Sequence, residues 1–256
     1  MTNREKYRFD DFTLQNYKRL LQLALDKGFV FSDYVLDLAD EVRSIIWRHD
    51  VEFSVHRALK MAQIESELGI KAHYFVQIHC EFYNTFEREI FDLLIRIRDL
   101  GHDIGLHFDA HFWNVQSKEQ LESALLKDKG LLEDLLSIKV SSFSFHNTTP
   151  ELLSMNDLHY AGLLNVYGKQ VRKKFRYCTD STGIWRYERL EDVLKDASIQ
   201  HLQVLTHDGM WQDEPMAPRQ RVLRSIDGRA LNGIKLYDNC LAKHDQKNID
   251  TGPVGE

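Results

Sequence analysis

Short apolar runs and longer amphipathic segments alternate along most of the chain. The runs are typical of buried strands, and they fall at residues 44–47, 72–76, 103–106, 140–145 and 204–205. Segments with apolar residues every three or four positions predict helices, which begin near Thr13, Ser54, Asn84, Ser117 and Pro150. Strands and helices that alternate at intervals of about 30 residues predict parallel β/α units. We therefore expect an α/β fold, either a (β/α) barrel or an open doubly wound sheet.

The predicted organisation is one domain with an addition at each end. Only 4 prolines and 13 glycines interrupt the chain, and no low-complexity linker divides it. Residues 1–43 contain a helix capped by Thr13 and ended by Gly28, and we expect them to form an N-terminal helical extension packed on the domain. Residues 44–240 hold the β/α units. Residues 241–256 are polar with little periodicity, which predicts a flexible tail.

Composition and charge exclude several classes of protein. The 256 residues include 33 lysines and arginines against 39 aspartates and glutamates, a formal net charge of −6, which argues against a nucleic-acid binder. No run of 18 apolar residues is present, so we expect no transmembrane segment. The first residues lack an apolar signal region, and we expect a cytoplasmic protein. Three cysteines far apart in the sequence fit reduced thiols, and they predict that thiolates do not bind a metal here.

The 12 histidines are informative because of where they fall. His49, His107, His146 and His207 each lie at the carboxyl end of a predicted strand. In parallel α/β folds, chemistry gathers at that edge of the sheet. The four positions therefore predict a functional site.

Two stretches of sequence point to a metal ion. His107 and His111 are four residues apart, so on one helical turn both imidazoles reach the same ion, although such a pair also occurs by chance or at a helix cap. Asp50 follows an apolar strand and can complete a site of two histidines and one carboxylate, while a salt-bridged strand end is the structural alternative. If the strand stays extended, Asp50 and Glu52 face one side and His49 faces the other.

His207 ends another apolar strand, next to Asp208. A histidine there, its pKa tuned by an acidic neighbour, can protonate a leaving amine as general acid. A purely structural histidine is the alternative interpretation.

The ordered motifs resemble the polysaccharide deacetylase-like proteins, also called the NodB-homology or carbohydrate esterase family four group. The resemblance covers about two-thirds of the chain, from Ile45 to Trp211. It rests on residues 48–52 (RHDVE), 71–76 (KAHYFV), 101–111 (GHDIGLHFDAH), 143–146 (FSFH), 180–185 (DSTGIW) and 204–207 (VLTH). The stretch 101–111 is the most specific of them.

This resemblance implies a distorted (β/α)7 barrel over residues 44–240 and a divalent metal, usually Zn²⁺. In that picture Asp50, His107 and His111 bind the metal, which activates a water molecule, and His207 protonates the departing amine. The residues implied to lie at the substrate are His146, Phe145, Asp180 and Trp185.

Two positions depart from the family pattern. The first motif usually has two adjacent aspartates, a base and a ligand, and His49 stands at the first position here. The base is therefore His49, Glu52 or a carboxylate elsewhere, and Glu52 is an alternative for either role. The third motif lacks the usual arginine and has His146 and Asn147 in its place.

The function predicted from these residues is hydrolysis of a linear amide C–N bond. The expected substrate is an N-acetyl or N-formyl amino sugar, or a sugar-linked intermediate, in the biosynthesis of a bacterial surface glycan such as an O-antigen or capsule. The alternatives are an amide hydrolase of the same fold with a non-sugar substrate, and a catalytically degenerate binding protein. The predicted partner is a small molecule rather than nucleic acid, and the sequence allows an oligomer.

Overall fold

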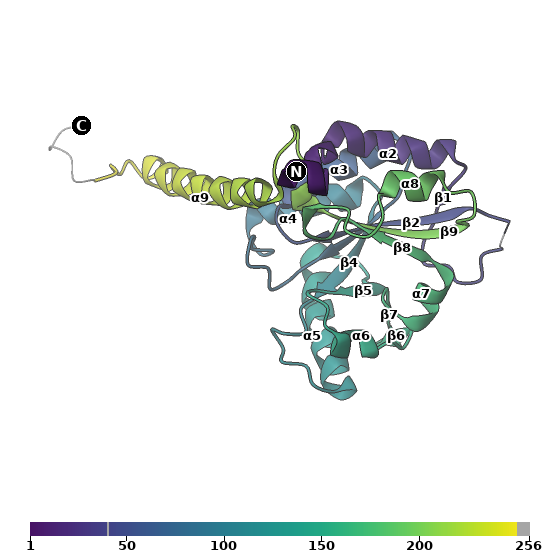
Figure 1. The fold of residues 1–256 in the computed structure, drawn as a ribbon. Helices are drawn as coiled ribbons and strands as arrows, with labels where there is room; N and C mark the ends of the chain where they lie inside the picture. The colour runs from purple at the N-terminus through teal and green to yellow at the C-terminus, as the bar shows by residue number, and fades with distance from the viewer. Residues whose placement is uncertain (40, 250–256) are drawn as a thin grey trace.

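A single curled sheet forms the centre of the computed structural model, which describes residues 1–39 and 41–249. Its strands lie in the spatial order β6–β7–β5–β4–β3–β2–β9–β8, and β1 pairs with the start of β2 (Figure 1). They are β1 (Val30–Phe31), β2 (Ser44–Val51), β3 (His73–Val76), β4 (Asp103–Phe108), β5 (Ser142–Phe145), β6 (His159–Tyr160), β7 (Leu163–Asn165), β8 (Arg176–Thr179) and β9 (His201–His207). Strand β6 runs antiparallel to β7, and the other described pairs are parallel.

Helices connect the strands and cover the outside of the sheet (Figure 1). The α-helices are α1 (Asn3–Tyr7), α2 (Leu14–Asp26), α3 (Val55–Glu67), α4 (Arg88–Asp99), α5 (Lys118–Leu136), α6 (Pro150–Ser154), α7 (Lys169–Lys174), α8 (Leu190–Lys195) and α9 (Pro218–Lys243). The described residues also form the short 3-10 helices η1 (Phe9–Asp11), η2 (Ser181–Gly183) and η3 (Asp208–Met210).

The curled, mostly parallel sheet is a half-barrel, which confirms the predicted α/β fold of the distorted-barrel type. Within the described residues, no strand pairing joins the edge strands β6 and β8, so the barrel stays open on that side. The inner face of the sheet is therefore reachable along the seam between its two edges.

Strand β2 lies at the middle of this arrangement, between β3 and β9. All eight of its residues are buried, because helices cover one face and the barrel interior covers the other. Its sequence shows no alternation of polar and apolar residues, as is typical of strands buried on both faces. Arg48, His49 and Asp50 are nevertheless among the buried residues, and each needs a partner inside the protein.

The N-terminal segment is built into the body of the protein. Leu14 donates its backbone N–H to the Gln212 carbonyl at 2.7 Å, and Gln212 donates to the Phe12 carbonyl at 3.1 Å. The Phe12 ring packs 4.9 Å from Trp211 and 5.5 Å from Trp185. Besides the predicted helix, which is α2, the first 43 residues also contribute strand β1 to the sheet.

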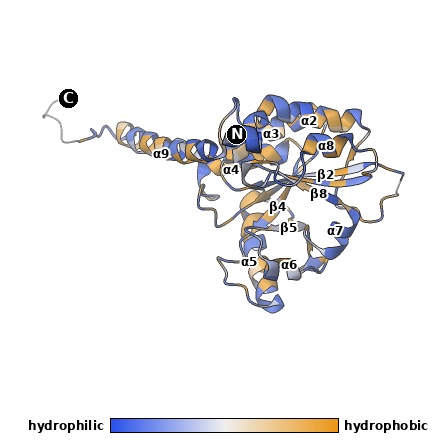
Figure 2. Ribbon diagram, in the orientation of Figure 1, coloured by the Kyte–Doolittle hydropathy of each residue, from blue (hydrophilic) through white to orange (hydrophobic). Residues whose placement is uncertain are grey.

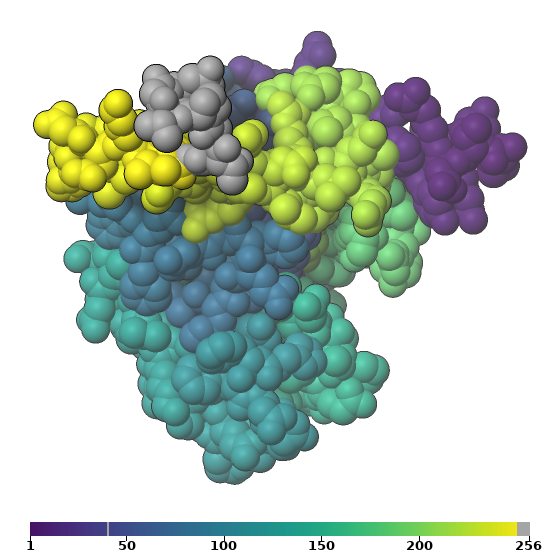
Figure 3. All heavy atoms as spheres, turned by 90° about the vertical axis from the view of Figure 1, so that its left-hand side faces the viewer, coloured from purple at the N-terminus to yellow at the C-terminus, as the bar shows by residue number. Residues whose placement is uncertain are grey.

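Helix α9 projects from the body, as Figure 1 shows, and in Figure 3 it lies at the opposite end of the molecule from α5. Arg221 is its one buried residue in the described part of the chain. Hydrophobic and hydrophilic residues alternate along it (Figure 2), and Leu231, Ile234 and Tyr237 are more than half exposed. The helix continues to Lys243, past the start of the predicted tail at residue 241, and residues 250–256 of that tail lie outside the described residues. No helix in the described ranges is long and apolar enough to cross a membrane.

Helix α4 begins later than the sequence pattern indicates. The sequence predicts a helix start near Asn84, whereas the first helical residue is Arg88 and Glu87 is the N-cap residue. The Asn84 side chain instead accepts the Phe86 N–H at 3.1 Å, a local turn that competes with helix initiation.

Gly105 in β4 gives a test of this packing. An alanine Cβ there would lie 2.5 Å from the Phe75 ring and 3.2 Å from the Ser142 carbonyl oxygen, so Gly105→Ala should lower the free energy of unfolding by roughly 1–3 kcal/mol. Gly130 in α5 is the matched control, because a Cβ there meets no described atom within 4 Å. Gly130→Ala should raise the same quantity by about 1 kcal/mol. Urea denaturation of the two variants measures both, and equal effects would contradict the close approach at Gly105.

Candidate metal centre and cleft

The carboxyl ends of four strands bring polar side chains to one edge of the sheet. Asp50 of β2 is in register with His207 of β9, and His107 of β4 is in register with Ser144 of β5. A cleft of about 930 Å³ lies over this edge, and Asp50 and His207 are among its lining residues. The edge identified from the sequence is therefore the edge that carries a cleft.

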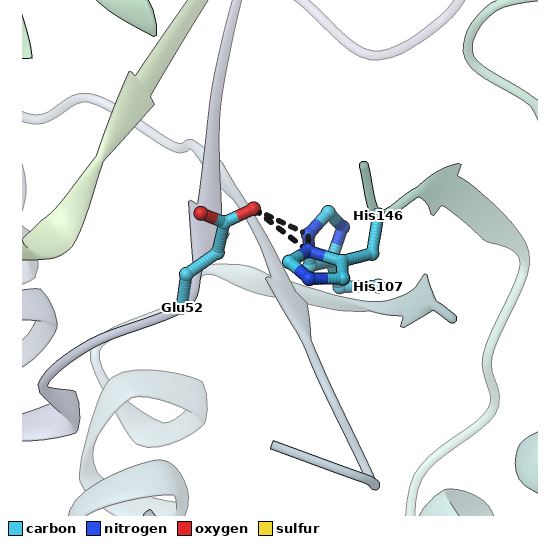
Figure 4. Close-up of side chains that lie close together, drawn as sticks. All are labelled: Glu52, His107 and His146. Atoms are coloured by element: carbon cyan, nitrogen blue, oxygen red, sulfur yellow. Dashed lines mark hydrogen bonds and ion pairs between the residues drawn. The ribbon is translucent and has the colours of Figure 1, made fainter. Parts of the chain in front are cut away.

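Glu52, His107 and His146 converge at this edge (Figure 4). Glu52 Oε1 lies 2.9 Å from His107 Nε2 and 3.0 Å from His146 Nδ1, and the two nitrogens are 3.1 Å apart. Burial alone would raise the pKa of Glu52, but the contacts with His107 and His146 hold it well below its usual range. The carboxylate is therefore ionised at neutral pH.

A chain of hydrogen bonds behind His107 fixes the orientation of its ring. Ser144 Oγ donates to Asp50 Oδ1 at 3.0 Å, and Arg48 Nη1 donates to the same oxygen at 3.0 Å. Because the only Ser144 hydroxyl proton goes to Asp50, its oxygen accepts the His107 Nδ1–H, 2.7 Å away. Nε2 is then the His107 nitrogen that faces Glu52 and His146.

The turn that carries Glu52 is held by Asp208. The Asp208 carboxylate accepts the backbone N–H groups of Glu52 at 2.7 Å, of Phe53 at 3.2 Å and of Ser54. Burial raises the pKa of Asp208 to about 6, while the three N–H groups favour its charged form. Asp208 thus fixes the backbone on which Glu52 is presented.

His207 forms an ion pair with the fully buried Asp180. His207 Nδ1 lies 2.6 Å from Asp180 Oδ1, and Trp211 Nε1 donates to Asp180 Oδ2 at 2.9 Å. Burial favours the neutral imidazole, but the charge and hydrogen bond of Asp180 prevail and raise the pKa of His207 to about 10. His207 is therefore a protonated imidazolium on the cleft at neutral pH.

The three converging atoms fit a divalent metal ion. Two imidazole nitrogens and one carboxylate oxygen are the donor set of catalytic zinc sites, which leave a position open for water or substrate. Ligand atoms at 2.0–2.1 Å from a tetrahedral ion lie about 3.3 Å from one another, close to the separations found among Glu52, His107 and His146. His107 also has the outer hydrogen-bond partner that metal-binding histidines usually have.

The structure brings some of the predicted metal ligands together and keeps others apart. His107 is in the cluster, and Asp50 lies behind it, with Oδ2 3.8 Å from His107 Nδ1. His111 is exposed, and its Nε2 donates to the Asn147 carbonyl at 3.0 Å. His146, expected at the substrate, supplies the second nitrogen of the cluster instead.

His49, a candidate base, lies on the other face of β2, as the strand period predicts. It is fully buried, with Nε2 2.7 Å from Glu65 Oε1 and Nδ1 2.7 Å from Thr206 Oγ1. His49 therefore takes no part in the cleft, whereas Glu52, the other candidate base, is in the cluster.

The remaining predicted substrate residues have different surroundings. Phe145 lines the cleft. Asp180 lies behind His207 rather than on the cleft surface. Trp185 is 9% exposed and packs against Phe12, so it belongs to the hydrophobic core.

A second group of potential ligands lies at the opposite end of the strands. His73 is in register with Asp103, and Asp33 lies nearby. Lys71 Nζ already contacts these carboxylates, at 2.7 Å from Asp103 and 3.4 Å from Asp33. The lysine charge occupies the place that a cation would need, so we interpret this group as an ion-pair cluster.

Arg48 and Ser144 contribute to the site but were given no role from the sequence, and Asp208 was considered only as the acidic neighbour of His207. Ser144 stands two residues before His146, and Arg48 two residues before Asp50, so the strand period alone puts each on the inner face. That period was the available signal for both. For Asp208 the signal was its position directly after the strand that ends at His207.

Comparisons with known proteins identify relatives of low similarity. No family model and no curated protein matches the sequence. Among solved structures, the chain is similar to a family 4 carbohydrate esterase from Bacillus anthracis, with 16% identity, a TM-score of 0.42 and coverage of 83% of this chain and 86% of the other. A family 4 acetyl xylan esterase from Clostridium thermocellum in complex with a cobalt ion has 16% identity to the chain and a TM-score of 0.42. The match covers 72% of this chain and 84% of the esterase. A pseudoenzyme of the same family from Bacillus anthracis has 14% identity and a TM-score of 0.42. The match covers 75% of this chain and 62% of the pseudoenzyme. Likenesses of this size do not bear on the roles of individual residues.

The hydrogen bond behind His107 can be tested with Ser144→Ala. Without the acceptor at Nδ1, the imidazole loses its fixed tautomer and orientation, and the Kd for Zn²⁺ should rise roughly 10- to 100-fold. Ser142→Ala, two residues earlier on the same face of β5, is the control and should leave the Kd unchanged. Isothermal titration calorimetry gives both values. Unchanged zinc affinity in Ser144→Ala would show that the contact does not orient a ligand.

The pair of His207 and Asp180 predicts a specific pH dependence. In Asp180→Asn the pKa of His207 should fall from about 10 toward its ordinary value of 6.5, because the stabilising charge is removed. Side-chain NMR of labelled histidine measures the titration, with Asp99→Asn, at the distant end of α4, as the control.

The same pair has a consequence for stability. Since folding raises the pKa of His207, the stabilisation is complete below about pH 6.5 and is lost as the pH rises through about 10. The difference in free energy of unfolding between the wild type and Asp180→Asn should therefore shrink between pH 6 and pH 10. A constant difference over that range would contradict the assigned ion pair.

Proposed function

We propose that the protein is a metal-dependent hydrolase that removes an N-acyl group, acetyl or formyl, from an amino sugar or sugar-linked intermediate. The observation that carries this proposal is the convergence of Glu52, His107 and His146 at the strand edge where Glu52 and His207 line the cleft, with Asp180 paired to His207. A metal-ligand set and a protonated histidine at one strand edge are the two parts that amide hydrolysis of this kind requires.

Glu52, His107 and His146 are the residues that would hold the metal. When bound, a divalent cation supplies polarisation of the acyl carbonyl and lowers the pKa of a water molecule beside it. Asp50 is restrained by Arg48 and Ser144, so it cannot move to the same point without breaking both contacts. We therefore assign Asp50 to the support of His107 rather than to the ligand set.

His207 is the proposed general acid. An amide breaks only when its poor leaving group, the amine nitrogen, receives a proton. Asp180 keeps His207 charged at neutral pH and holds Nδ1, which leaves Nε2 as the atom that donates this proton. Because the pKa of His207 is about 10, we expect the acid to remain protonated across the physiological range.

The shape and lining of the cleft support a sugar as the substrate. Its volume of about 930 Å³ is large enough for a ligand much bigger than an acetyl group. Aromatic residues, among them Phe145, Tyr167 and Tyr187, form part of its wall. The resemblance of the motifs to polysaccharide deacetylases supports the same class. We propose the biosynthesis of a bacterial surface glycan, an O-antigen or capsule, as the setting.

Activity and metal content together test the proposal. The zinc-loaded protein should release acetate or formate from an N-acylated amino sugar, and chelation should abolish the release. Glu52→Gln and His146→Ala should lose both stoichiometric zinc and activity. His207→Gln should keep the zinc and lose roughly 10²- to 10⁴-fold in kcat. Coupled assays of acid release and metal analysis by mass spectrometry measure these effects.

His111→Ala is the control for the ligand set, and it should keep its zinc. The opposite result, zinc lost from His111→Ala and kept by His146→Ala, would favour the ligands that the motif resemblance implies. Absence of stoichiometric zinc in the wild type would argue for a binding protein. Hydrolysis restricted to amides without a sugar would argue for the alternative substrate class.

A further inference from the structure

The Arg48 guanidinium has two nitrogens, Nε and Nη2, that have no role in the proposed reaction. Its side chain is fully buried on the inner face of β2. Nη1 donates to Asp50 at 3.0 Å, whereas Nε and Nη2 have no hydrogen-bond partner among the described residues. Unpaired donors on a buried guanidinium destabilise the folded protein, so the position calls for an acceptor.

The cleft extends to the depth of Arg48. In the parallel register, Arg48 stands beside Leu205 and Ile46 stands beside Gln203. Leu205 and Gln203 both line the cleft, so the cleft passes the level of Arg48 on its way into the half-barrel. The guanidinium therefore lies beside the cleft floor rather than in a separate part of the core.

Two tyrosines separate Arg48 from the open part of the cleft. The guanidinium carbon lies 4.8 Å from the centre of the Tyr167 ring and 6.0 Å from that of Tyr177, and both tyrosines line the cleft. Tyr177 is 37% exposed, and its side chain is hydrogen-bonded to Tyr167. A ligand reaches the guanidinium once Tyr177 turns toward the solvent and releases this contact.

The chemistry of the two unpaired nitrogens specifies the ligand. Nε and Nη2 form one edge of the guanidinium, and their parallel N–H groups match the two oxygens of a carboxylate. A singly charged, planar group suits a site between aromatic rings in which Asp50 already neutralises part of the arginine charge. A doubly charged phosphate would bring more negative charge to the same point, at a larger cost of desolvation.

We propose that Arg48, with Tyr167 and Tyr177 as its walls, binds a carboxylate carried by the sugar that is deacylated. Asp50 connects the two parts of the site: it contacts Arg48 at 3.0 Å and His107 at 3.8 Å. This short path places the carboxylate on the same monosaccharide unit as the N-acyl group. The substrate class is then an N-acylated amino sugar acid, an inference that rests on the proposed function.

Binding of sugars without an acyl group tests the site separately from the reaction. Methyl glucuronide and methyl glucoside differ only at C6, which carries a carboxylate in the first and a hydroxymethyl group in the second. We expect calorimetry on the zinc-loaded protein to give a Kd roughly 10- to 100-fold lower for the glucuronide. Equal affinities would overturn the proposal, whether or not the protein deacylates any substrate.

Variants assign this preference to Arg48. Arg48→Lys keeps the charge but loses the paired N–H edge, so the preference should fall to less than about threefold. The double variant Arg48→Gln with Asp50→Asn removes the buried pair without leaving an unpaired charge, and it provides the test if the lysine variant does not fold. Arg172→Gln changes an exposed arginine of the same cleft and should keep the preference. A preference that survives in both Arg48 variants would overturn the assignment. Glucose 6-phosphate bound as tightly as the glucuronide would overturn the choice of carboxylate.

Where deacylation occurs, the same preference should appear in kcat/KM for an N-acetylated hexosaminuronate over the matched N-acetylhexosamine. Its absence there, together with selective binding of the glucuronide, would place the carboxylate on another unit of the substrate and overturn the single-unit assignment. Failure of both compounds to react, with selective binding retained, would contradict the proposed function and leave the carboxylate site standing.

Discussion

The pairing of buried charges along β2 is the constraint on which the rest of the structure depends. Arg48, His49 and Asp50 are consecutive and at most 2% exposed, in a strand covered on both faces. Because successive side chains point to opposite faces, the strand carries one polar network inward and another outward. The inward network joins Arg48 and Asp50 to the histidines of the cleft. Each buried polar side chain needs a partner on the same face of β2, and this requirement determines which elements pack against that face.

The outward network shows how far this constraint reaches. His49 contacts Glu65 of α3 at 2.7 Å, and the burial that raises the pKa of Glu65 is outweighed by His49, which lowers it. Tyr17 of α2 donates to the same Glu65 carboxylate and accepts the Trp47 indole N–H at 2.8 Å. Helix α2 therefore contributes a hydrogen bond to the Glu65 carboxylate that the buried His49 contacts. Removal of α2 would expose this network as well as an apolar surface.

Sequence periodicity predicted the parts of this structure that depend on local pattern. The strand period placed Asp50 and Glu52 together and His49 opposite, and the alternation of elements predicted the curled α/β sheet. The sequence pattern did not indicate that His146 rather than His111 lies beside His107, because the positions of both depend on the loop after β5, where Asn147 adopts a positive φ of 46° and its carbonyl accepts from His111. The motif resemblance implied that Trp185 lies at the substrate, and no local pattern reveals that Phe12, more than 170 positions earlier, packs against it.

The open seam of the barrel gives the inward network access to a ligand. A closed barrel of this size is filled by side chains, and the pair of Arg48 and Asp50 would then be only a structural ion pair. Here the described pairings leave β6 and β8 apart, and the cleft enters along the inner face beside them. Arg48, Asp50, Ser144 and His107 are joined in series by hydrogen bonds of 2.7–3.0 Å. A group bound at the arginine would therefore act on the same hydrogen bonds that orient His107, so the proposed substrate site and the proposed metal site share one network.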